Sequence, residues 1–445
     1  MSQPPLRVAM IGYGTVGRGV AQLLHEQADL YADRVGRSIT LTKILVRDLA
    51  KATAAAESAN VDAGLFTDNA DAFFAADSGD KADVVIEVAG GIDPVGGYVK
   101  RALEAGQHVI TANKSLLAKD GPALFATARQ HGVSLAFEAS IGGGIPCVTA
   151  LTAGLMANRI SGLFGILNGT CNYILTQMTQ HGESYADALQ GAKEKGYAEA
   201  DETLDVSGAD AAQKLAVLAS LAYGVNITED DVPCHGIDTL DLDDVRYGDE
   251  LGFDIKLIAS AERWRGQDYI ALNTAPCFIP KSEQLAQVHG SFNALSVVGH
   301  AVGHTMFYGR GAGQGPTASA IVGDLLNVAC GAYPQAFGNM RLTPDLHQPA
   351  PLVEPGDLES RWYLRVNALD VPGVVAKMTQ ALGDRGISLS SLLQHDAHAA
   401  DDFVPVVIAT HEAKRGDLDA AAQAIEQLAE VHGQPVVYRI LDLPQ

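Results

Sequence analysis

Apolar residues in the first third of the chain come in short, mainly apolar runs, each followed by a glycine turn or by a segment with helical spacing. The runs are Leu6 to Ile11, Ile39 to Val46, Asp83 to Val88, His108 to Ala112 and Leu135 to Glu138. Such short runs are typical of parallel strands that are buried on both faces of a sheet. The pattern therefore predicts an α/β fold, with a doubly wound domain over residues 1–135.

Helical and alternating patterns follow in the middle of the chain. After Gly208, an Ala- and Leu-rich segment predicts a helix that buries Leu215, Leu218 and Leu221. Residues 226–310 mix helical segments with alternating strands, and we expect them to form the mixed sheet on which two subunits meet. We assign residues 136–333 to an α+β substrate and dimerisation domain.

The last quarter of the chain has a pattern of its own. Residues 334–358 are rich in Pro, Gly and polar groups, with little periodicity, and we interpret them as a linker. From Arg361 the order is strand, helix, strand, strand, helix, strand. A βαββαβ order predicts a small ferredoxin-like domain over residues 359–445.

Composition narrows the class of protein. The chain has 445 residues, 47% of them hydrophobic, which is enough for several buried cores. A formal net charge of −22 argues against binding to nucleic acid or anionic membrane. Five scattered cysteines, with no CysXXCys pair, indicate neither disulfides nor a zinc site. Without a signal segment or a long apolar run, we expect a soluble cytoplasmic protein whose partners are small molecules or its own copies.

The first apolar run ends in a glycine-rich turn before a helical segment. Its residues are Gly12, Tyr13, Gly14, Thr15, Val16 and Gly17. Glycines at this spacing between strand and helix let the backbone approach a pyrophosphate, as in Rossmann-like domains, so these six are candidate cofactor ligands. The alternative is a tight turn without nucleotide. Arg47 follows the second run where an acid would bind a ribose, and it favours NADP over NAD unless it faces solvent.

Acidic residues cluster around the start of the helix after Gly208. Asp210 and Lys214 stand four residues apart, side by side on one helix face. Glu199 and Asp205 precede them. An isolated pair of this kind is usually solvated. Beside a buried sequence, the cluster suits a pocket in which acids hold an amino group while the lysine moves a proton to an oxygen.

This stretch closely resembles the signature of the homoserine dehydrogenases. The signature places small, acidic and basic residues at fixed spacing, and the chain matches it at Ala192, Gly196, Asp201, Asp205, Gly208, Asp210 and Lys214. Glu202 stands where the family has a proline. That departure leaves the local turn less constrained, but no side chain assigned to chemistry is lost.

The resemblance implies NAD(P)H-dependent reduction of L-aspartate 4-semialdehyde to L-homoserine, in threonine and methionine biosynthesis. It also implies roles for single residues. These are catalysis by Lys214 and Lys114, substrate binding by Glu199, Asp205 and Asp210, and cofactor binding by Gly196, Gly313 and again Lys114. Taken without the resemblance, Lys114 is a surface lysine after a strand.

The segment from Glu138 to Ile145 resembles the part of the family that binds a monovalent cation, Na⁺ or K⁺. The resemblance implies that the Glu138 carboxylate and the backbone carbonyls of Ile141, Gly143 and Ile145 supply hard oxygen ligands. Without it, Glu138 is interpreted as a hydrogen-bonded strand acid.

The turn from Asp370 to Gly373 resembles the ACT family of amino-acid-sensing domains. The resemblance implies an amino-acid effector, with L-threonine as the first candidate, and a homodimer or homotetramer. A dimerisation domain that has lost its ligand is the alternative. Since no catalytic residue is assigned to the tail, we expect a chain ending near Glu354 to stay folded and active.

Two other functions stay open at this point. One is an aldehyde dehydrogenase that forms a thioester on Cys147 or Cys171, although neither cysteine has a histidine nearby in the sequence. The other is a non-catalytic amino-acid sensor that retains an inactive nucleotide domain.

Overall fold

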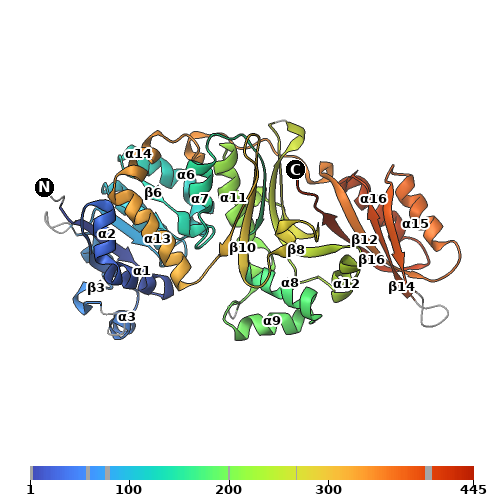
Figure 1. The fold of residues 1–445 in the computed structure, drawn as a ribbon, viewed down its shortest axis with the longest axis horizontal. Coiled ribbons are helices and arrows are strands. Elements are labelled where there is room, and N and C mark those ends of the chain that lie inside the picture. Colours follow the sequence, from blue (N-terminus) through green and yellow to red (C-terminus); the bar gives the residue numbers. More distant parts are fainter. Residues whose placement is uncertain are drawn as a thin grey trace.

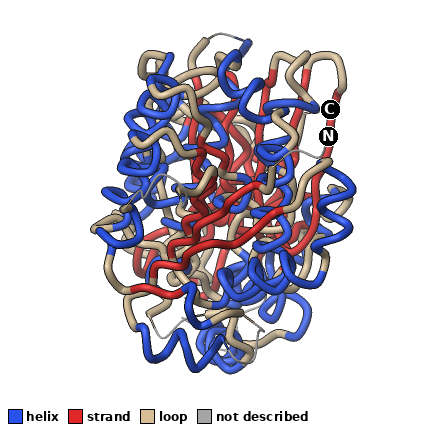
Figure 2. The backbone as a smooth tube through the Cα atoms, turned by 90° about the vertical axis from the view of Figure 1, so that its left-hand side faces the viewer, coloured by secondary structure: helices blue, strands red, loops and turns tan. Residues whose placement is uncertain are grey.

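The structure is a computed structural model that describes residues 4–56, 61–75, 81–198, 201–266, 268–395 and 403–444. The molecule is elongated, with a parallel sheet at the N-terminal end, a mixed sheet in the middle and the C-terminal strands at the far end (Figure 1). Viewed from the N-terminal end, strands run through the centre and helices lie outside them (Figure 2).

The N-terminal sheet is parallel, in the order β3-β2-β1-β4-β5-β6. Its strands are β1 (Leu6–Ile11), β2 (Ile39–Leu45), β3 (Phe66–Thr67), β4 (Val84–Glu87), β5 (His108–Thr111) and β6 (Leu135–Ala136). The predicted doubly wound architecture is confirmed. The strand order reverses between β1 and β4, and open α/β sheets bind ligands at the carboxyl ends of the strands at such a point.

Helices cover both faces of this sheet. They are α1 (Thr15–Glu26), α2 (Ala28–Val35), α3 (Leu49–Ala56), α4 (Ala70–Phe74), α5 (Val95–Glu104) and α6 (Lys114–Gln130). Helix α13 (Gln314–Ala329) joins them from far along the chain, an orange helix among the blue ones in Figure 1. It packs so closely on α1 that a Cβ atom on Gly19 would lie 2.7 Å from Cγ of Gln314.

The prediction that the last strand of this domain runs from Leu135 to Glu138 is wrong for its last two residues. Strand β6 ends at Ala136, and Glu138 begins a short 3-10 helix, η3 (Glu138–Ser140). The reason is a change of partner, since the Glu138 amide donates to Oδ2 of Asp324 in α13 at 3.0 Å instead of to a neighbouring strand. The chain leaves the first sheet here.

The middle of the chain builds the core of a ten-stranded sheet. Its strands there are β7 (Ile160–Ile166), β8 (Phe253–Arg263), β9 (Ile270–Pro280), β10 (Phe292–Gly299) and β11 (Gly303–Arg310), and its helices are α7 (Cys147–Thr149), α8 (Gly169–His181), α9 (Tyr185–Glu194), α10 (Thr203–Val206), α11 (Ala209–Tyr223) and α12 (Leu242–Glu250). Helix α11 buries Leu215, Leu218 and Leu221, as predicted. The expected mixture of helices and strands is confirmed.

The tail has the predicted βαββαβ order. It comprises β12 (Glu359–Leu369), α15 (Val374–Gly383), β13 (Leu389–Gln394), β14 (Phe403–Thr410), the short β15 (Ala413–Lys414), α16 (Arg415–Glu426) and β16 (Val431–Ile440). The sequence did not predict that these strands continue the central sheet. Strand β16 pairs in parallel with β9, through Arg439 with Cys277 and Ile440 with Phe278.

Buried ion pairs also join the tail to the body. The Arg365 guanidinium donates to both oxygens of the fully buried Asp244, at 2.6 and 2.9 Å. Arg439 donates to Glu262 at 2.8 Å. Buried charges need partners of this kind, so the tail and the body are mutually dependent.

The segment expected as a linker carries helix α14 (Ala332–Asn339) and lies against the body. Asp345 accepts a hydrogen bond from Arg129 of α6 at 2.9 Å. The carbonyl of Pro351 accepts from the amide of Ile270 in β9 at 2.9 Å. In the part of the chain that the structure describes, no helix combines the length and the apolar character needed to cross a bilayer.

Candidate active site

The glycine turn between β1 and α1 leaves an open cradle of backbone. Gly12 has φ +101°, and a Cβ there would lie 2.7 Å from the amide nitrogen of Ala89. A Cβ on Gly17 would lie 2.5 Å from the Gly12 carbonyl oxygen, whereas nothing lies within 4 Å of a Cβ built on Gly14. The turn therefore requires glycine at positions 12 and 17. At Gly14, where α1 begins, the backbone is open to a ligand. Such a helix start fits a pyrophosphate.

The other predicted cofactor residues differ in their surroundings. Tyr13 is buried and packs edge-on against Phe66, with ring centroids 4.8 Å apart, so it anchors the turn in the core. Thr15 and Val16 form the first turn of α1. Arg47 is exposed, just beyond the end of β2, whose Leu45 carbonyl accepts from the Gly12 amide at 2.9 Å.

Lys114 is placed by a network that the sequence analysis missed. The buried Glu87 at the end of β4 accepts from the amides of Ala89 and Gly90 and from the Thr111 hydroxyl. Asn113 caps α6, accepting from the Leu116 amide at 3.1 Å while its own amide group donates to Gly91. The signal in the sequence that could have revealed this network was Glu87, an acid at the end of an apolar strand.

Lys114 and Lys214 meet at one buried carboxylate. Lys114 Nζ lies 3.1 Å from Oδ1 of Asp210, and Lys214 Nζ lies 2.8 Å from Oδ2. Lys214 also donates to the Leu167 carbonyl at 2.8 Å. The structure thus brings together residues from α6 and α11, nearly a hundred positions apart in the sequence, at the boundary between the two sheets.

Asn168, the N-cap of α8, connects the acids of this centre. Its side-chain amide donates to Asp205 at 2.7 Å and to Asp210 at 2.9 Å, while its oxygen accepts from the Cys171 amide. The sequence analysis gave Asn168 no role. One amide side chain therefore fixes the positions of both carboxylates relative to the helix.

The two acids of the centre have different pKa values. Burial alone would raise the pKa of Asp210, but the ammonium groups of Lys214 and Lys114 outweigh burial and hold it at about 2. For Asp205, burial prevails over the Asn168 hydrogen bond and raises the pKa of the carboxyl. Two carboxylates in one site with opposite shifts are typical of sites where amino groups and protons are handled.

Other predicted residues lie apart from this centre or outside the described chain. Asp201 is exposed and accepts from the Thr203 amide, and Glu202 pairs with Lys193 at 2.8 Å. Gly196 lies in an exposed turn after α9 with φ +70°. Glu199 lies outside the residues that the structure describes.

The predicted cation segment is held in place by close backbone packing. A Cβ on Gly143 would lie 2.3 Å from the Gly311 carbonyl oxygen, so the segment touches the chain just before Gly313, the N-cap of α13. The Glu138 carboxylate accepts from the amides of Val148 and Thr149 at 2.8 and 2.7 Å. The Ile145 carbonyl accepts from the Cys147 amide.

The carbonyl oxygens of Ile141 and Gly143 fit a cation best, since within the described residues neither accepts a hydrogen bond. The Glu138 carboxylate fits less well, because its oxygens already cap α7. Among the same residues, no group of three or more His, Cys, Asp or Glu side chains could hold a metal ion. A cation here would therefore depend on backbone oxygens.

The cysteines are poorly suited to nucleophilic catalysis. Cys147 and Cys171 are 1% and 0% exposed. Burial, together with nearby carboxylates, raises the pKa of both thiols, so the reactive thiolate is disfavoured. Thioester chemistry on either cysteine therefore lacks support.

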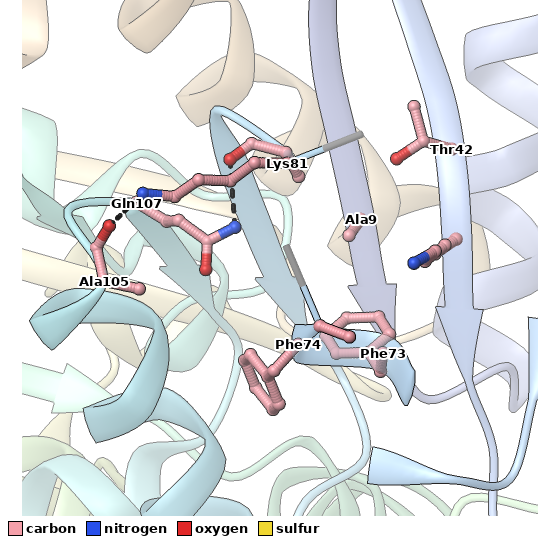
Figure 3. Close-up of a pocket in the computed structure, with 10 residues that line it drawn as sticks. Ala9, Thr42, Phe73, Phe74, Lys81, Ala105 and Gln107 are labelled. Atoms are coloured by element: carbon pink, nitrogen blue, oxygen red, sulfur yellow. Dashed lines mark hydrogen bonds between the residues drawn. The ribbon is translucent and has the colours of Figure 1, made fainter. Parts of the chain in front are cut away.

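A small cavity of about 130 Å³ lies in the N-terminal domain (Figure 3), and none of the predicted site residues lines it. Ala9, Phe73 and Phe74 line it, and its polar groups already have partners. Lys81 donates to the Ala105 carbonyl, and Gln107 donates to the Ala82 carbonyl. We assign no function to it.

Comparison with known proteins identifies the family. The family model described as homoserine dehydrogenase, NAD binding domain, matches residues 12–138, and the model described as homoserine dehydrogenase matches residues 146–326. The ACT domain model matches residues 362–430. The homoserine dehydrogenase of Pseudomonas aeruginosa is 40% identical over 442 residues, which cover 99% of each chain. This chain belongs to the homoserine dehydrogenase family.

Solved structures agree with the assignment. A homoserine dehydrogenase from Thiobacillus denitrificans has a TM-score of 0.91 at 38% identity, covering 99% of this chain and 100% of its own. A solved chain from Archaeoglobus fulgidus, 32% identical with a TM-score of 0.64, is covered over 99% of its length but covers only 73% of this one. Homoserine dehydrogenases are oxidoreductases. Membership of this family sets aside both the sensor without activity and the thioester-forming aldehyde dehydrogenase.

Proposed function

We propose that Lys114, Asp210 and Lys214 form the centre at which L-aspartate 4-semialdehyde is reduced to L-homoserine. The observation that carries this proposal is the contact of two lysine ammonium groups with one buried carboxylate, at 3.1 and 2.8 Å. Two positive groups held beside one carboxylate can stabilise the negative charge that develops on an aldehyde oxygen.

Lys214 is the proposed proton donor. A bound nicotinamide cofactor supplies the hydride. The Leu167 carbonyl and Asp210 hold two of the three hydrogens of the Lys214 ammonium, which leaves one for the substrate oxygen. An ammonium group in hydrogen-bond reach of the substrate oxygen can act as the general acid for the alkoxide that forms there.

The substrate ammonium is proposed to bind to Asp205 and to Glu199. Asp210 already accepts from Lys114, Lys214 and Asn168, so its role is to hold the lysines rather than to bind the ammonium alone. Asp205 accepts from Asn168 through Oδ1, and its carboxylate is proposed to accept from the substrate ammonium as well. Glu199 enters through the family resemblance only.

The cofactor is proposed to be NADP, with NAD as the alternative. The open backbone from Gly12 to Gly17 would hold the pyrophosphate, and the α13 start at Gly313 would close the same site. Gly196 would approach the cofactor from the substrate side. Arg47 would contact the 2′-phosphate.

A monovalent cation is proposed to bind the carbonyls of Ile141, Gly143 and Ile145, with Glu138 anchoring the segment through α7. Na⁺ and K⁺ both suit neutral oxygens. ²³Na relaxation in the full-length protein tests this directly. Saturable broadening that K⁺ displaces would support the proposal, and the absence of any protein-dependent broadening would contradict it.

The proton-donor assignment is tested with Lys214→Met, which removes the charge and keeps the length of the side chain. We expect kcat to fall by about 10²-fold or more, with NADPH binding by fluorescence nearly unchanged. Lys193→Met is the matched control, because Lys193 pairs with Glu202 outside the centre. Wild-type kcat in Lys214→Met would show that another group donates the proton.

A further inference from the structure

The loop after β4, residues 89–91, lies between the glycine turn and the start of α6. At one end, a Cβ on Gly12 would lie 2.7 Å from the first amide nitrogen of this loop. At the other end, the carbonyl of Gly91 accepts from the side-chain amide of Asn113 at 2.6 Å. Asn113 directly precedes Lys114. A cofactor that runs from the glycine turn towards Lys114 must therefore cross the loop.

The outer face of this loop is open. All three of its residues are exposed, and a Cβ built on Gly90 or Gly91 would have nothing within 4 Å. Both glycines have positive φ, +70° and +79°, which residues with a side chain rarely adopt. The loop is therefore one backbone thick over this stretch. A ligand above it would lie close to the group beneath it.

The group beneath the loop is a carboxylate. Glu87, the last residue of β4, is 0% exposed. Its Oε1 accepts from the amides of Ala89 and Gly90 at 2.9 and 3.0 Å, and its Oε2 accepts from the Thr111 hydroxyl at 2.6 Å. The Thr111 oxygen in turn accepts from the Asn113 amide at 3.0 Å, so its own hydrogen is available for Glu87. Since O–H···O⁻ bonds measure about 2.5–2.7 Å, these contacts fit an ionised carboxylate.

This negative charge has no cationic partner. Among the described residues, the partners of the Glu87 carboxylate are two amides and one hydroxyl, with no Lys, Arg or His side chain. The lysine that begins α6, Lys114, pairs with Asp210 instead. A buried charge without a counter-ion is costly, and hydrogen bonds offset only part of that cost. A glutamine could make similar hydrogen bonds without a charge, so the charge itself calls for a role.

We propose that the negative charge of Glu87 favours the oxidised over the reduced form of the nicotinamide cofactor, and so promotes hydride transfer to the aldehyde. The hydride leaves the nicotinamide ring for the aldehyde carbon, and a lysine ammonium gives the oxygen its proton. The ring is left with a positive charge that it lacked before. A carboxylate across one layer of backbone attracts that charge, because opposite charges interact strongly inside a protein.

The reaction thus develops opposite charges at its two ends. The lysine ammonium groups beside Asp210 would stabilise the negative charge on the substrate oxygen, and Glu87 would stabilise the positive charge on the ring. Hydrogen bonds already fix the Glu87 carboxylate, so it needs no reorganisation when that charge appears. Glu87 acts across the loop and touches neither cofactor nor substrate. It can act in this way only if the cofactor binds at the proposed site.

Glu87→Gln tests the proposal, because it removes the charge and keeps the shape of the side chain. The glutamine oxygen can still accept from the loop amides, and its nitrogen can donate to the Thr111 oxygen. Calorimetry on the full-length protein without substrate measures Kd for NADP⁺ and for NADPH. We expect Kd for NADP⁺ to rise at least about tenfold and Kd for NADPH to change less than about twofold. Equal changes in both constants, or none, would overturn the proposal.

Thr111→Val is the matched control for the shape of the network. It removes one hydrogen bond from Glu87 and keeps the charge. Its thermal unfolding temperature should fall, while the ratio of the two dissociation constants stays that of the wild type. A shift of this ratio as large as in Glu87→Gln would assign the effect to the shape of the loop and overturn the role of the charge.

A second pair of variants tests the charge without altering Glu87. Gly91→Asp and Gly91→Asn differ by one negative charge on the exposed loop, and Asp and Asn tolerate positive φ better than most residues. NADP⁺ should bind more tightly relative to NADPH in Gly91→Asp than in Gly91→Asn. The same ratio in both variants would contradict the proposal.

Gly14→Val separates this role of Glu87 from the cofactor site. A Cβ on Gly14 meets no protein atom within 4 Å, so the added bulk occupies the space proposed for the pyrophosphate. Both cofactor forms should bind at least about tenfold more weakly. Undiminished binding would refute the cofactor site and the role of Glu87 together. Weaker binding in Gly14→Val, with no change in Glu87→Gln, would leave the cofactor site standing and refute only the role of Glu87.

Discussion

Asn168 shows how one side chain can determine the electrostatics of a site. It donates to two carboxylates that would otherwise repel each other, and it also caps α8. An amide can do both, because its nitrogen carries two hydrogens and its oxygen accepts. Its role is one of positioning, since it acts through Asp205 and Asp210.

Asn168→Asp keeps an oxygen for the cap but places a third carboxylate between the two acids. We expect kcat/KM at neutral pH to fall at least tenfold. The acidic limb of its pH profile should rise by about one unit, because like charges disfavour ionisation. The pH dependence of kcat/KM checks this. Asn168→Ser tests the cap separately, and an unchanged profile in Asn168→Asp would mean that neither acid affects turnover.

Arg47 tests the cofactor preference at a single position. If its guanidinium contacts the 2′-phosphate, Arg47→Ala should raise KM for NADPH by about tenfold and leave KM for NADH unchanged. Steady-state kinetics with both cofactors measures this. Arg34→Ala, in α2, is the control, and equal effects of Arg47→Ala on both cofactors would remove the proposed contact.

Among the elements, β8 carries a lysine where a strand normally buries an apolar residue. Lys256 is 2% exposed and donates to the Val288 carbonyl at 2.7 Å. Burial, only partly offset by Asp254, lowers its pKa to about 8. Between pH 8 and about 10.4 the unfolded chain binds more protons at this position than the folded chain does, so this lysine makes stability rise with pH there.

Lys256→Met should abolish that contribution. Relative to the wild type, the variant should gain most below pH 8, by at most about 3 kcal/mol, and the gain should shrink towards pH 10. The Val288 carbonyl keeps a donor, because Asn172 also bonds to it at 3.1 Å. Urea unfolding at several pH values measures the difference, with Lys377→Met as the surface control. A gain that does not vary with pH would exclude the proton linkage.

The sequence predicted elements better than it predicted their contacts. The strand runs, the glycine turn, α11 and the βαββαβ tail all follow from local periodicity. The meeting of Lys114 with Asp210 required the family resemblance, since nothing local relates them. The roles of Glu138 and Glu87 were harder to predict from the sequence. An acid at the end of a strand can cap a helix, hold a loop or bind a cation, and only its tertiary partners determine which of these it does.

At the scale of the whole molecule, the ten-stranded sheet shows that the tail is part of the central sheet and not a separate module. The βαββαβ order alone favoured a separable module, and removal was expected to leave an active body. The pairing of β9 with β16 joins strands more than 150 residues apart, and no periodicity reveals such a pairing.

We now expect a chain ending at Glu354 to be less stable than the full-length protein. Removing Arg365 and Tyr363 leaves Asp244 without its partners and opens the edge of β9. Breaking a buried pair of this type costs about 3–5 kcal/mol. Thermal unfolding of the truncated chain measures the loss. Adding Asp244→Asn to the truncated chain should recover part of the lost stability, because it removes the unpaired buried charge. Equal stability of the truncated and full-length chains would contradict the interpretation.

The contact between Gly143 and Gly311 also has a genetic consequence. A Cβ on Gly143 would strike the Gly311 carbonyl, and one on Gly311 would lie 2.1 Å from the Asn293 side chain. Every missense change in a glycine codon adds at least a Cβ atom. A library of random point mutations, selected for growth that depends on this enzyme, should therefore lose all amino-acid variation at both codons, while Gly14, with open space around it, tolerates alanine at the level of folding.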